Sequence, residues 1–267
     1  MLLSIRHETV YRYTAPISYT IQQLRLSPRV ESQQRTLSWQ IGCEGSRHAF
    51  IDAYGNLSHM LTITGLHDEV RIVAEGAVEV TPLDQGRLAD NGTLSPQVFT
   101  VPTRLAAADE AVIAFAHAHL QPGARSGELL VLAEAIRSAV AYRSGATGVT
   151  STAADALCLA QGVCQDHAHL FLACCHVHGI PARYVSGYID PGGSDHAESH
   201  AWVDAWVDEV GFSGWVSIDV THARFAGASH CRLAIGRDYE SAAPVRGMRR
   251  GGGAESLGVA VAVTPLG

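Results

Sequence analysis

The sequence has no apolar run approaching the roughly 20 residues that a helix needs to cross a bilayer. Its first residues, Met1 to Thr14, alternate like a strand and lack the apolar region and cleavage site of a secretion signal. It also lacks a concentrated basic surface, because the formal charge is −7 and the notable basic cluster is Arg246, Arg249 and Arg250. Phosphate binding needs such a surface. We expect a soluble, cytoplasmic protein that binds neither membrane nor nucleic acid.

A disulfide framework is missing too. The cysteines show no regular spacing, and a chain of 267 residues can bury a core without cross-links, so we expect reduced thiols. Hydrophobic residues make up 47% and charged residues 17%, which is typical of a globular protein. The 14 histidines require that a metal site be considered. The six cysteines are Cys43, Cys158, Cys164, Cys174, Cys175 and Cys231.

The first 80 residues have the alternating pattern of β structure and lack helical periodicity. We predict strands over residues 2–13, 36–41, 57–63 and 70–80, with turn chemistry at Tyr54-Gly55-Asn56. Residues 81–102 contain three prolines and few large apolar residues, which is typical of a linker. The sequence therefore predicts an N-terminal β domain (1–80), a linker (81–102) and a second domain (103–267).

The second domain begins with a change to helical periodicity. We predict helices over residues 103–120, 126–142 (capped by Ser126), 152–159 and 164–178, the last one largely apolar and therefore buried. Strands are predicted next, over residues 182–189, 200–207 and 215–219. The bend Gly251-Gly252-Gly253 precedes a final alternating strand, Leu257 to Val263, which we expect to pair with the N-terminal domain.

A cysteine at the start of the buried helix, a histidine on a strand and an aspartate ending the next strand form a coherent reactive set: Cys164, His200 and Asp219. A free thiol with a pKa of about 8.5 is mostly protonated at neutral pH, and a helix N-terminus favours the reactive thiolate. A neighbouring imidazolium favours it further and can protonate the departing amine. A carboxylate can hold the imidazole in the correct tautomer.

These residues lie in segments that resemble the bacterial transglutaminase-like superfamily, whose members include cysteine proteases. The resemblance covers nearly the whole chain, and its cysteine segment is the most specific part. The matching segments are Gly162 to Asp166, Ala168 to Leu170, Gly179 to Tyr188, His200 to Val203 and Trp215 to Thr221 in the core, Leu24 to Arg29, Trp39 and Asp52 to Asn56 before it, and Gly236 to Tyr239 with Pro244 and Gly247 after it.

The resemblance implies an α+β fold: a papain-like transglutaminase core, with the nucleophile helix packed on an antiparallel sheet, preceded by a β-sandwich-like domain. It also implies acyl transfer from an amide through a thioester, without a metal or other cofactor. Three positions depart from the family pattern. Val220 and His222 stand where the family usually has proline and asparagine, and His167 replaces an aromatic residue.

Other residues compete for these roles. His196 is a rival base, and Asp204 and Asp208 are rival carboxylates. Asp166 and His169 can position the nucleophile helix or merely cap it. A metal interpretation of Cys174, Cys175, His176 and His178 is disfavoured, because only Cys174 and His178 share a helix face.

The sequence thus predicts a cysteine hydrolase, peptidase or acyltransferase acting on peptide or amide bonds, with a primary amine as a potential acceptor. One oxyanion donor is expected to be the backbone N–H of Cys164, and Tyr142 is a candidate for the other. The alternatives are a non-catalytic peptide-binding module with the same fold and a metallohydrolase. The substrate, the choice between hydrolysis and transfer, and the oligomeric state are left open.

Overall fold

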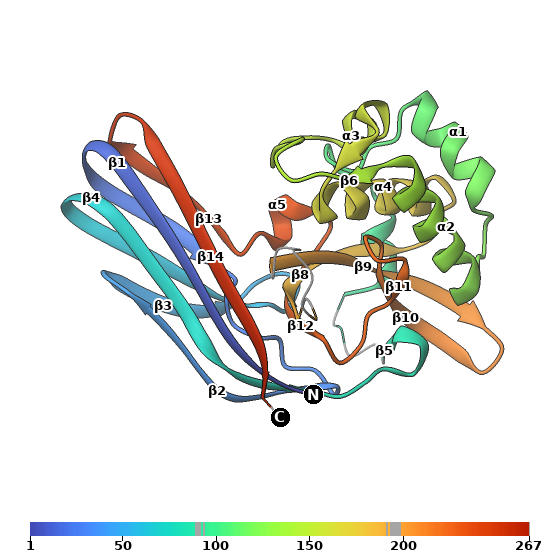
Figure 1. Ribbon diagram of the computed structural model, residues 1–267, viewed down its shortest axis with the longest axis horizontal. Coiled ribbons are helices and arrows are strands. Elements are labelled where there is room, and N and C mark those ends of the chain that lie inside the picture. The colour runs from blue at the N-terminus through green and yellow to red at the C-terminus, as the bar shows by residue number, and fades with distance from the viewer. Residues whose placement is uncertain (89–91, 93, 191, 193–198, 267) are drawn as a thin grey trace.

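The computed structural model describes residues 1–88, 92, 94–190, 192 and 199–266. Figure 1 shows two parts: a domain of long strands and a core of helices packed on a sheet. The fold class predicted from the sequence, an α+β core preceded by a sandwich-like β domain, is confirmed. Among the helices within these ranges, none has the length and apolar character needed to cross a membrane.

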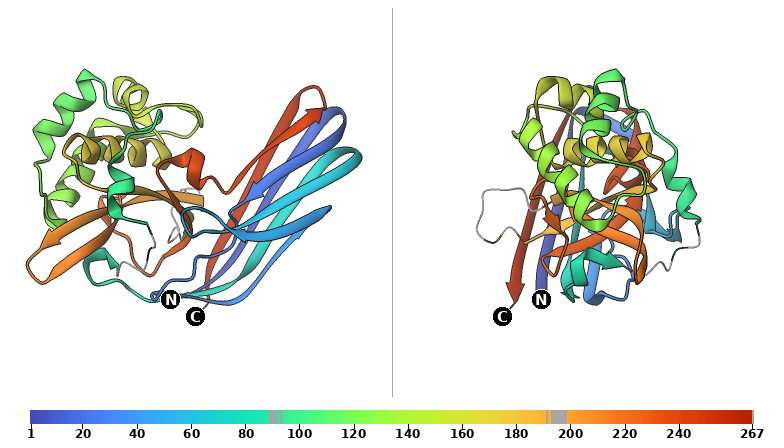
Figure 2. Two further views of the ribbon diagram at one scale, coloured as in Figure 1. Left: turned by 180° about the vertical axis from the view of Figure 1, so that it is seen from behind. Right: turned by 90° about the vertical axis from the view of Figure 1, so that its right-hand side faces the viewer.

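The β domain is built on two long antiparallel strands, β1 (Leu2–Leu24) and β4 (Leu57–Val80). Both turn back near their middle, so that their halves lie in two layers, as the views in Figures 1 and 2 show. The register of this pair shifts between Arg12 and Ile17, where β1 bends. One half of β4 pairs with β2 (Gln34–Cys43) and the other with β3 (Ser46–Ile51).

The two halves of β1 pair in the same way with the last two strands of the chain. Strand β13 (Val245–Gly251) pairs with residues 17–24, and β14 (Glu255–Leu266) pairs with residues 2–13. Alternation directs apolar side chains from both layers inward. The resulting cluster contains Tyr13, Ile17, Leu24, Leu26, Ile41, Leu61, Ile63, Val70, Ile72 and Ala74.

This domain differs from the sequence-based expectation at four places. The strands predicted over residues 57–63 and 70–80 form the single strand β4. The strand predicted to end at Tyr13 continues to Leu24, because β4 and β13 continue the pairing beyond the bend. Strand β3 was not predicted, since every one of its residues is exposed and no alternation marks it. Strand β13 was also not predicted, because it is rich in arginine and glycine.

The core contains an antiparallel sheet in the order β11-β10-β9-β8-β12. Apolar residues of α4 and of the sheet pack together in one cluster that also includes residues of the other long helices. The strands are β8 (Ala182–Ile189), β9 (Ser199–Glu209), β10 (Phe212–Asp219), β11 (Arg224–Phe225) and β12 (His230–Gly236). The helices are α1 (Glu110–His119), α2 (Ser126–Ala139), α3 (Ala153–Leu159), α4 (Cys164–Val177) and α5 (Tyr239–Ala242).

Two predicted helices need correction at their ends. The first begins at Glu110 rather than at residue 103, because the Asp109 carboxylate accepts the Val112 N–H at 2.9 Å and caps the helix there. The second ends at Ala139, and Ser126 is not its cap. The Glu128 carboxylate instead accepts the Arg125 N–H at 2.7 Å, while the Ser126 hydroxyl donates to Glu209.

The segment predicted as a linker contains short elements of its own. These are η1 (Asp84–Gly86), β5 (Arg87–Leu88) and η2 (Pro96–Thr100), and β5 pairs with β10 of the core sheet. Residues 89–91 and 93 of the predicted linker lie outside the described residues. The pairing of β5 attaches this part of the segment to the core.

Two motifs of the β domain hold it to the core. The Arg25 guanidinium donates to the Ala243 carbonyl at 3.4 Å, and the Asn56 amide exchanges hydrogen bonds of 2.8 and 2.9 Å with the backbone of Ile235. Gln34 exchanges hydrogen bonds with the backbone of Arg232 in the same manner, at 2.7 and 2.9 Å. The two domains therefore meet at strand β12, through buried and directional contacts.

Candidate active site

Cys164 is the first residue of α4, and its side chain is partly exposed while most of this helix is buried. The Asp166 carboxylate fixes the start of the helix, accepting the Val163 N–H at 2.7 Å and the Thr147 hydroxyl at 2.6 Å. Gly162 is required here, because an added Cβ would lie 2.7 Å from the Cβ of Asp166. The thiol is thus held at the positive end of the helix dipole.

His200 lies between this thiol and a carboxylate. Its Nε2 donates to the Asp219 Oδ1 at 2.9 Å, and Cys164 is near enough to contribute to the raised pKa of the ring. Strand β9 brings His200 and strand β10 brings Asp219, and the two strands are adjacent and antiparallel. The structure therefore brings together the three residues that the sequence predicted as a triad.

The electrostatics of this arrangement favour a charged pair. Burial alone would lower the pKa of His200, but the Asp219 carboxylate and Cys164 reverse this effect and raise the pKa to about 10. Burial likewise opposes ionisation of Asp219, and the neighbouring histidines overcome it and hold the pKa of this carboxyl well below its usual range. The geometry thus favours an imidazolium next to the thiol at neutral pH.

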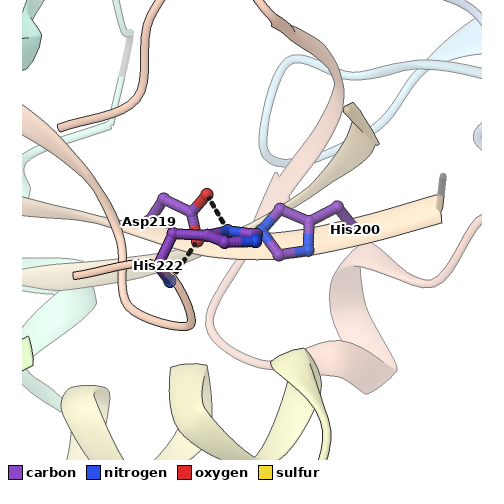
Figure 3. Close-up of side chains that lie close together, drawn as sticks. All are labelled: His200, Asp219 and His222. Atoms are coloured by element: carbon purple, nitrogen blue, oxygen red, sulfur yellow. Dashed lines mark hydrogen bonds and ion pairs between the residues drawn. The ribbon is translucent and has the colours of Figure 1, made fainter. Parts of the chain in front are cut away.

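Asp219 accepts hydrogen bonds from three histidines rather than one. Figure 3 shows it between His200 and His222, whose Nδ1 lies 2.7 Å from the Asp219 Oδ2. His230 Nε2 lies 3.0 Å from the same oxygen. The Gly227 N–H donates to the Nδ1 of His230, which places the His230 proton on Nε2 and makes this ring a neutral donor. The carboxylate is therefore held by donors on several sides.

The sequence pointed to His222 as an added titratable group but missed His230. Nothing local marks His230, which lies at the start of β12, 11 residues after Asp219. The rival base His196 lies outside the described residues. Of the rival carboxylates, Asp204 binds Arg183 and Arg232 at 2.8 and 2.5 Å, and Asp208 is exposed.

The remaining candidates occupy the surroundings of the thiol. Tyr142 lies in β6 (Ala141–Tyr142), which pairs in parallel with β7 (Gln161–Gly162), so that Tyr142 stands opposite Gly162. Burial raises the pKa of Tyr142, and the charge of nearby Cys164 raises it further. His167 is buried and bonds Thr221 and the Val140 carbonyl, and His169 accepts the Tyr239 N–H.

Three side chains of the same site are potential metal ligands. His200, Asp219 and His222 offer ligand atoms within 4.8 Å of one another, which is a set that Zn²⁺ can use. These atoms already hydrogen-bond to each other, so a metal would have to displace those bonds. Cys174 and Cys175 are fully buried among apolar side chains of the core, as expected from packing.

The roles of the two added histidines can be separated by stability. His230→Leu keeps the volume of the side chain but removes a buried donor, so we expect it to lower the free energy of unfolding by about 1–3 kcal/mol. His222→Asn should cost less, because asparagine retains a donor and His222 is partly exposed. Urea unfolding of both variants measures the difference. Equal losses would show that Asp219 does not depend on the buried donor.

Comparison with known proteins finds a family match in each part of the chain. Residues 3–79 match the model of the bacterial transglutaminase-like N-terminal region, and residues 120–220 match the transglutaminase-like superfamily. An uncharacterized protein of Mycobacterium leprae, ML0607, is 31% identical over 287 residues, covering 99% of each chain. The chain belongs to the transglutaminase-like superfamily and carries the bacterial transglutaminase-like N-terminal region.

Two further proteins are similar along most of the chain. The uncharacterized protein Rv2569c of Mycobacterium tuberculosis is 28% identical over 270 residues, covering 91% of this chain and 86% of the relative. A crystal structure from Cytophaga hutchinsonii, of a protein named as a candidate cysteine protease, superposes with a TM-score of 0.79 at 22% identity. It covers 99% of this chain and 90% of that chain, and it shows the shared fold.

Proposed function

We propose that this protein is a cysteine-nucleophile enzyme that transfers acyl groups from amide or peptide bonds. The observation that carries the proposal is the position of His200, buried between the Cys164 thiol and the Asp219 carboxylate. Family membership supports the same reaction class. Peptides or amides are the proposed substrates.

In the proposed reaction the Cys164 sulfur attacks the amide carbonyl carbon, and a C–S bond forms. The His200 imidazolium gives its proton to the departing nitrogen as the C–N bond breaks, which leaves a thioester and a free amine. Water or a primary amine then attacks the thioester, and His200 takes a proton from this nucleophile. The thiolate leaves, and the product is a carboxylic acid or a new amide. Asp219 orients His200 throughout.

The negative oxygen formed in each attack needs hydrogen-bond donors. The backbone N–H of Cys164 is the first proposed donor, because α4 begins there and its first N–H groups have no partner within the helix. The phenol of Tyr142 is the second proposed donor, since it lies within electrostatic reach of Cys164. A Tyr142→Phe variant would isolate this contribution.

The proposed location is the cytoplasm, where a reactive thiol stays reduced. All six cysteines are free thiols. This state suits a reducing compartment. Fractionation of the native host with an antibody against the protein would test the location directly.

Selective alkylation tests the proposed nucleophile. Limiting iodoacetamide at about pH 6 should label Cys164 first, because a thiolate paired with an imidazolium persists where ordinary thiols are protonated. Burial raises the pKa of Cys174 to about 12 and raises the pKa of Cys175 and Cys231 as well. Cys158 is exposed and serves as the internal standard for an ordinary thiol. Mass spectrometry of tryptic peptides gives the order of labelling.

Equal labelling of Cys158 and Cys164 would contradict the proposal and favour a peptide-binding module. A metallohydrolase would instead copurify with zinc and lose activity with a chelator, while Cys164→Ala would remain active. Hydrolysis and transfer are separated by adding a primary amine to the assay. All 19 basic residues are arginine, so lysine side chains of this sequence do not compete as acceptors.

A further inference from the structure

A cavity lies where the two domains meet, apart from Cys164, His200 and Asp219. Its volume is about 550 Å³, and it is lined by side chains from β1, from the segment before α1, and from α5 with its flanking residues. In Figure 1 this short helix lies between β13 and the helices of the core. Clefts between domains are frequent ligand sites. The charged residues of the lining are Arg25, Arg104, Arg237, Arg246, Asp238 and Glu240.

The lining is positively charged, although the chain has a formal charge of −7. Four arginines face two carboxylates in the lining, and one of these, Asp238, keeps its charge while it caps α5 by accepting the Ser241 N–H and hydroxyl. Glu240 is shared by two arginines, at 3.2 Å from Arg104 and 3.8 Å from Arg246. One carboxylate cannot neutralise both guanidinium groups.

The other two arginines differ in how they are held. Arg25 is balanced by Asp52 at 2.9 Å. Arg237 donates to the backbone carbonyls of Val101 and Pro102, at 3.0 and 3.1 Å, and these contacts leave its charge in place. The cavity therefore offers guanidinium groups that carry more charge than the nearby carboxylates balance. Guanidinium binds carboxylate in a forked, two-point geometry.

Residues beside this cavity also contact the helix that carries the Cys164 thiol. Tyr239, next to the lining residue Asp238, donates its N–H at 3.1 Å to His169, which lies on the nucleophile helix. The Tyr239 ring packs against Tyr184 with centroids 6.3 Å apart. Burial raises the pKa of Tyr184 well above its ordinary value, and the charges of Cys164 and Asp238 raise it further. One phenol is thus within electrostatic reach of both the nucleophile and the cavity wall.

We propose that this arginine-lined cavity binds carboxylate groups of the substrate, so that the enzyme prefers acidic peptides. The preference for acidic substrates rests on the proposed function. Binding of a carboxylate in the cavity does not require catalysis. Glu240 acts as an internal competitor that occupies Arg104 and Arg246 until a substrate carboxylate replaces it.

Binding can be measured on the full chain with Cys164→Ala, which prevents turnover. The probes are N-acetylated tetraglutamate and tetraglutamine, both amidated at the C-terminus, titrated by calorimetry at low salt. We expect tetraglutamate to bind at least about tenfold more tightly. Arg104→Gln with Arg246→Gln should remove most of this preference. Glu240→Gln should increase the affinity for tetraglutamate several-fold, because it removes the competitor.

Arg35→Gln is the matched control, since Arg35 also pairs with an exposed glutamate, Glu79, but lies outside the cavity. It should leave both affinities unchanged. Tetraglutamate with a free C-terminus shows whether the chain end or the side chains supply the carboxylate. Equal affinity for the two probes would overturn the proposal, as would a weaker tetraglutamate complex in Glu240→Gln. Tighter binding of inorganic phosphate than of tetraglutamate would overturn the carboxylate assignment. Failure of Cys164 alkylation would affect the proposed function without changing these binding results.

Discussion

Replacing His200 with alanine should lower kcat/KM on amide substrates by about three orders of magnitude or more, as removal of a triad member does in related chemistry. The variant loses the group that lies between Cys164 and Asp219, and with it the proton needed by the departing amine. Steady-state assays on an amide library give the ratio. The rate of Cys164 alkylation at about pH 6 should fall in parallel, because the imidazolium that stabilises the thiolate is gone.

Two further variants make this result specific. Cys164→Ala should be as inactive as His200→Ala, and the double variant should be no worse, because the two residues act as one unit. Asp219→Asn should reduce alkylation less, since the imidazole remains but is poorly oriented. If His200→Ala kept near-normal turnover, the assignment of His200 as proton donor would be wrong.

The free energy of unfolding should fall by at least about 5 kcal/mol between pH 6.5 and pH 4, because two buried histidines are neutral in the folded protein. Burial lowers the pKa of His7 to about 4 and that of His169 to about 4, from an ordinary value of 6.5. Over this range the unfolded chain takes up protons that the folded protein does not, so acid favours unfolding. Each histidine contributes about 2.5 kcal/mol of this loss.

Denaturant unfolding at a series of pH values measures this slope. His7→Gln and His169→Gln should each reduce the fall in stability by about 2.5 kcal/mol, whereas a substitution of the exposed His48 should leave it unchanged. His200 acts in the opposite direction, because its folded pKa of about 10 stabilises the protein below pH 6.5 and this contribution is lost as the pH rises towards 10. Stability that stays constant from pH 6.5 to 4 would contradict the prediction.

The elements with strong local signals could be predicted from the sequence. Helix α4 begins at Cys164 and ends before Gly179 because its apolar pattern is bounded by glycine on both sides. Strand β8 was predicted with its observed bounds for a similar reason, since it is rich in apolar and aromatic residues and follows Pro181. The predicted site residues lie on elements of this kind: Cys164 on α4, His200 on β9 and Asp219 on β10, each of which was predicted from its local pattern.

The parts that could not be predicted depend on contacts between distant residues. His230 lies at the start of β12, 11 residues after Asp219, and no spacing rule connects these two residues. The four arginines of the arginine-lined cavity come from both ends of the chain and from its middle. The start of α1 was missed because its alanine-rich pattern extends back beyond Asp109, where a single side-chain hydrogen bond sets the boundary.

The pairing of Leu2 with Leu266 has a consequence for the order of folding. During synthesis β1 emerges first, but one of its edges stays uncovered until β13 and β14 have been made, after the whole catalytic core. Contacts so distant in sequence close slowly, and an uncovered strand edge is prone to aggregation. The core helices, whose contacts are more local, should therefore fold before the N-terminal domain is complete, in reverse of the usual N-to-C order.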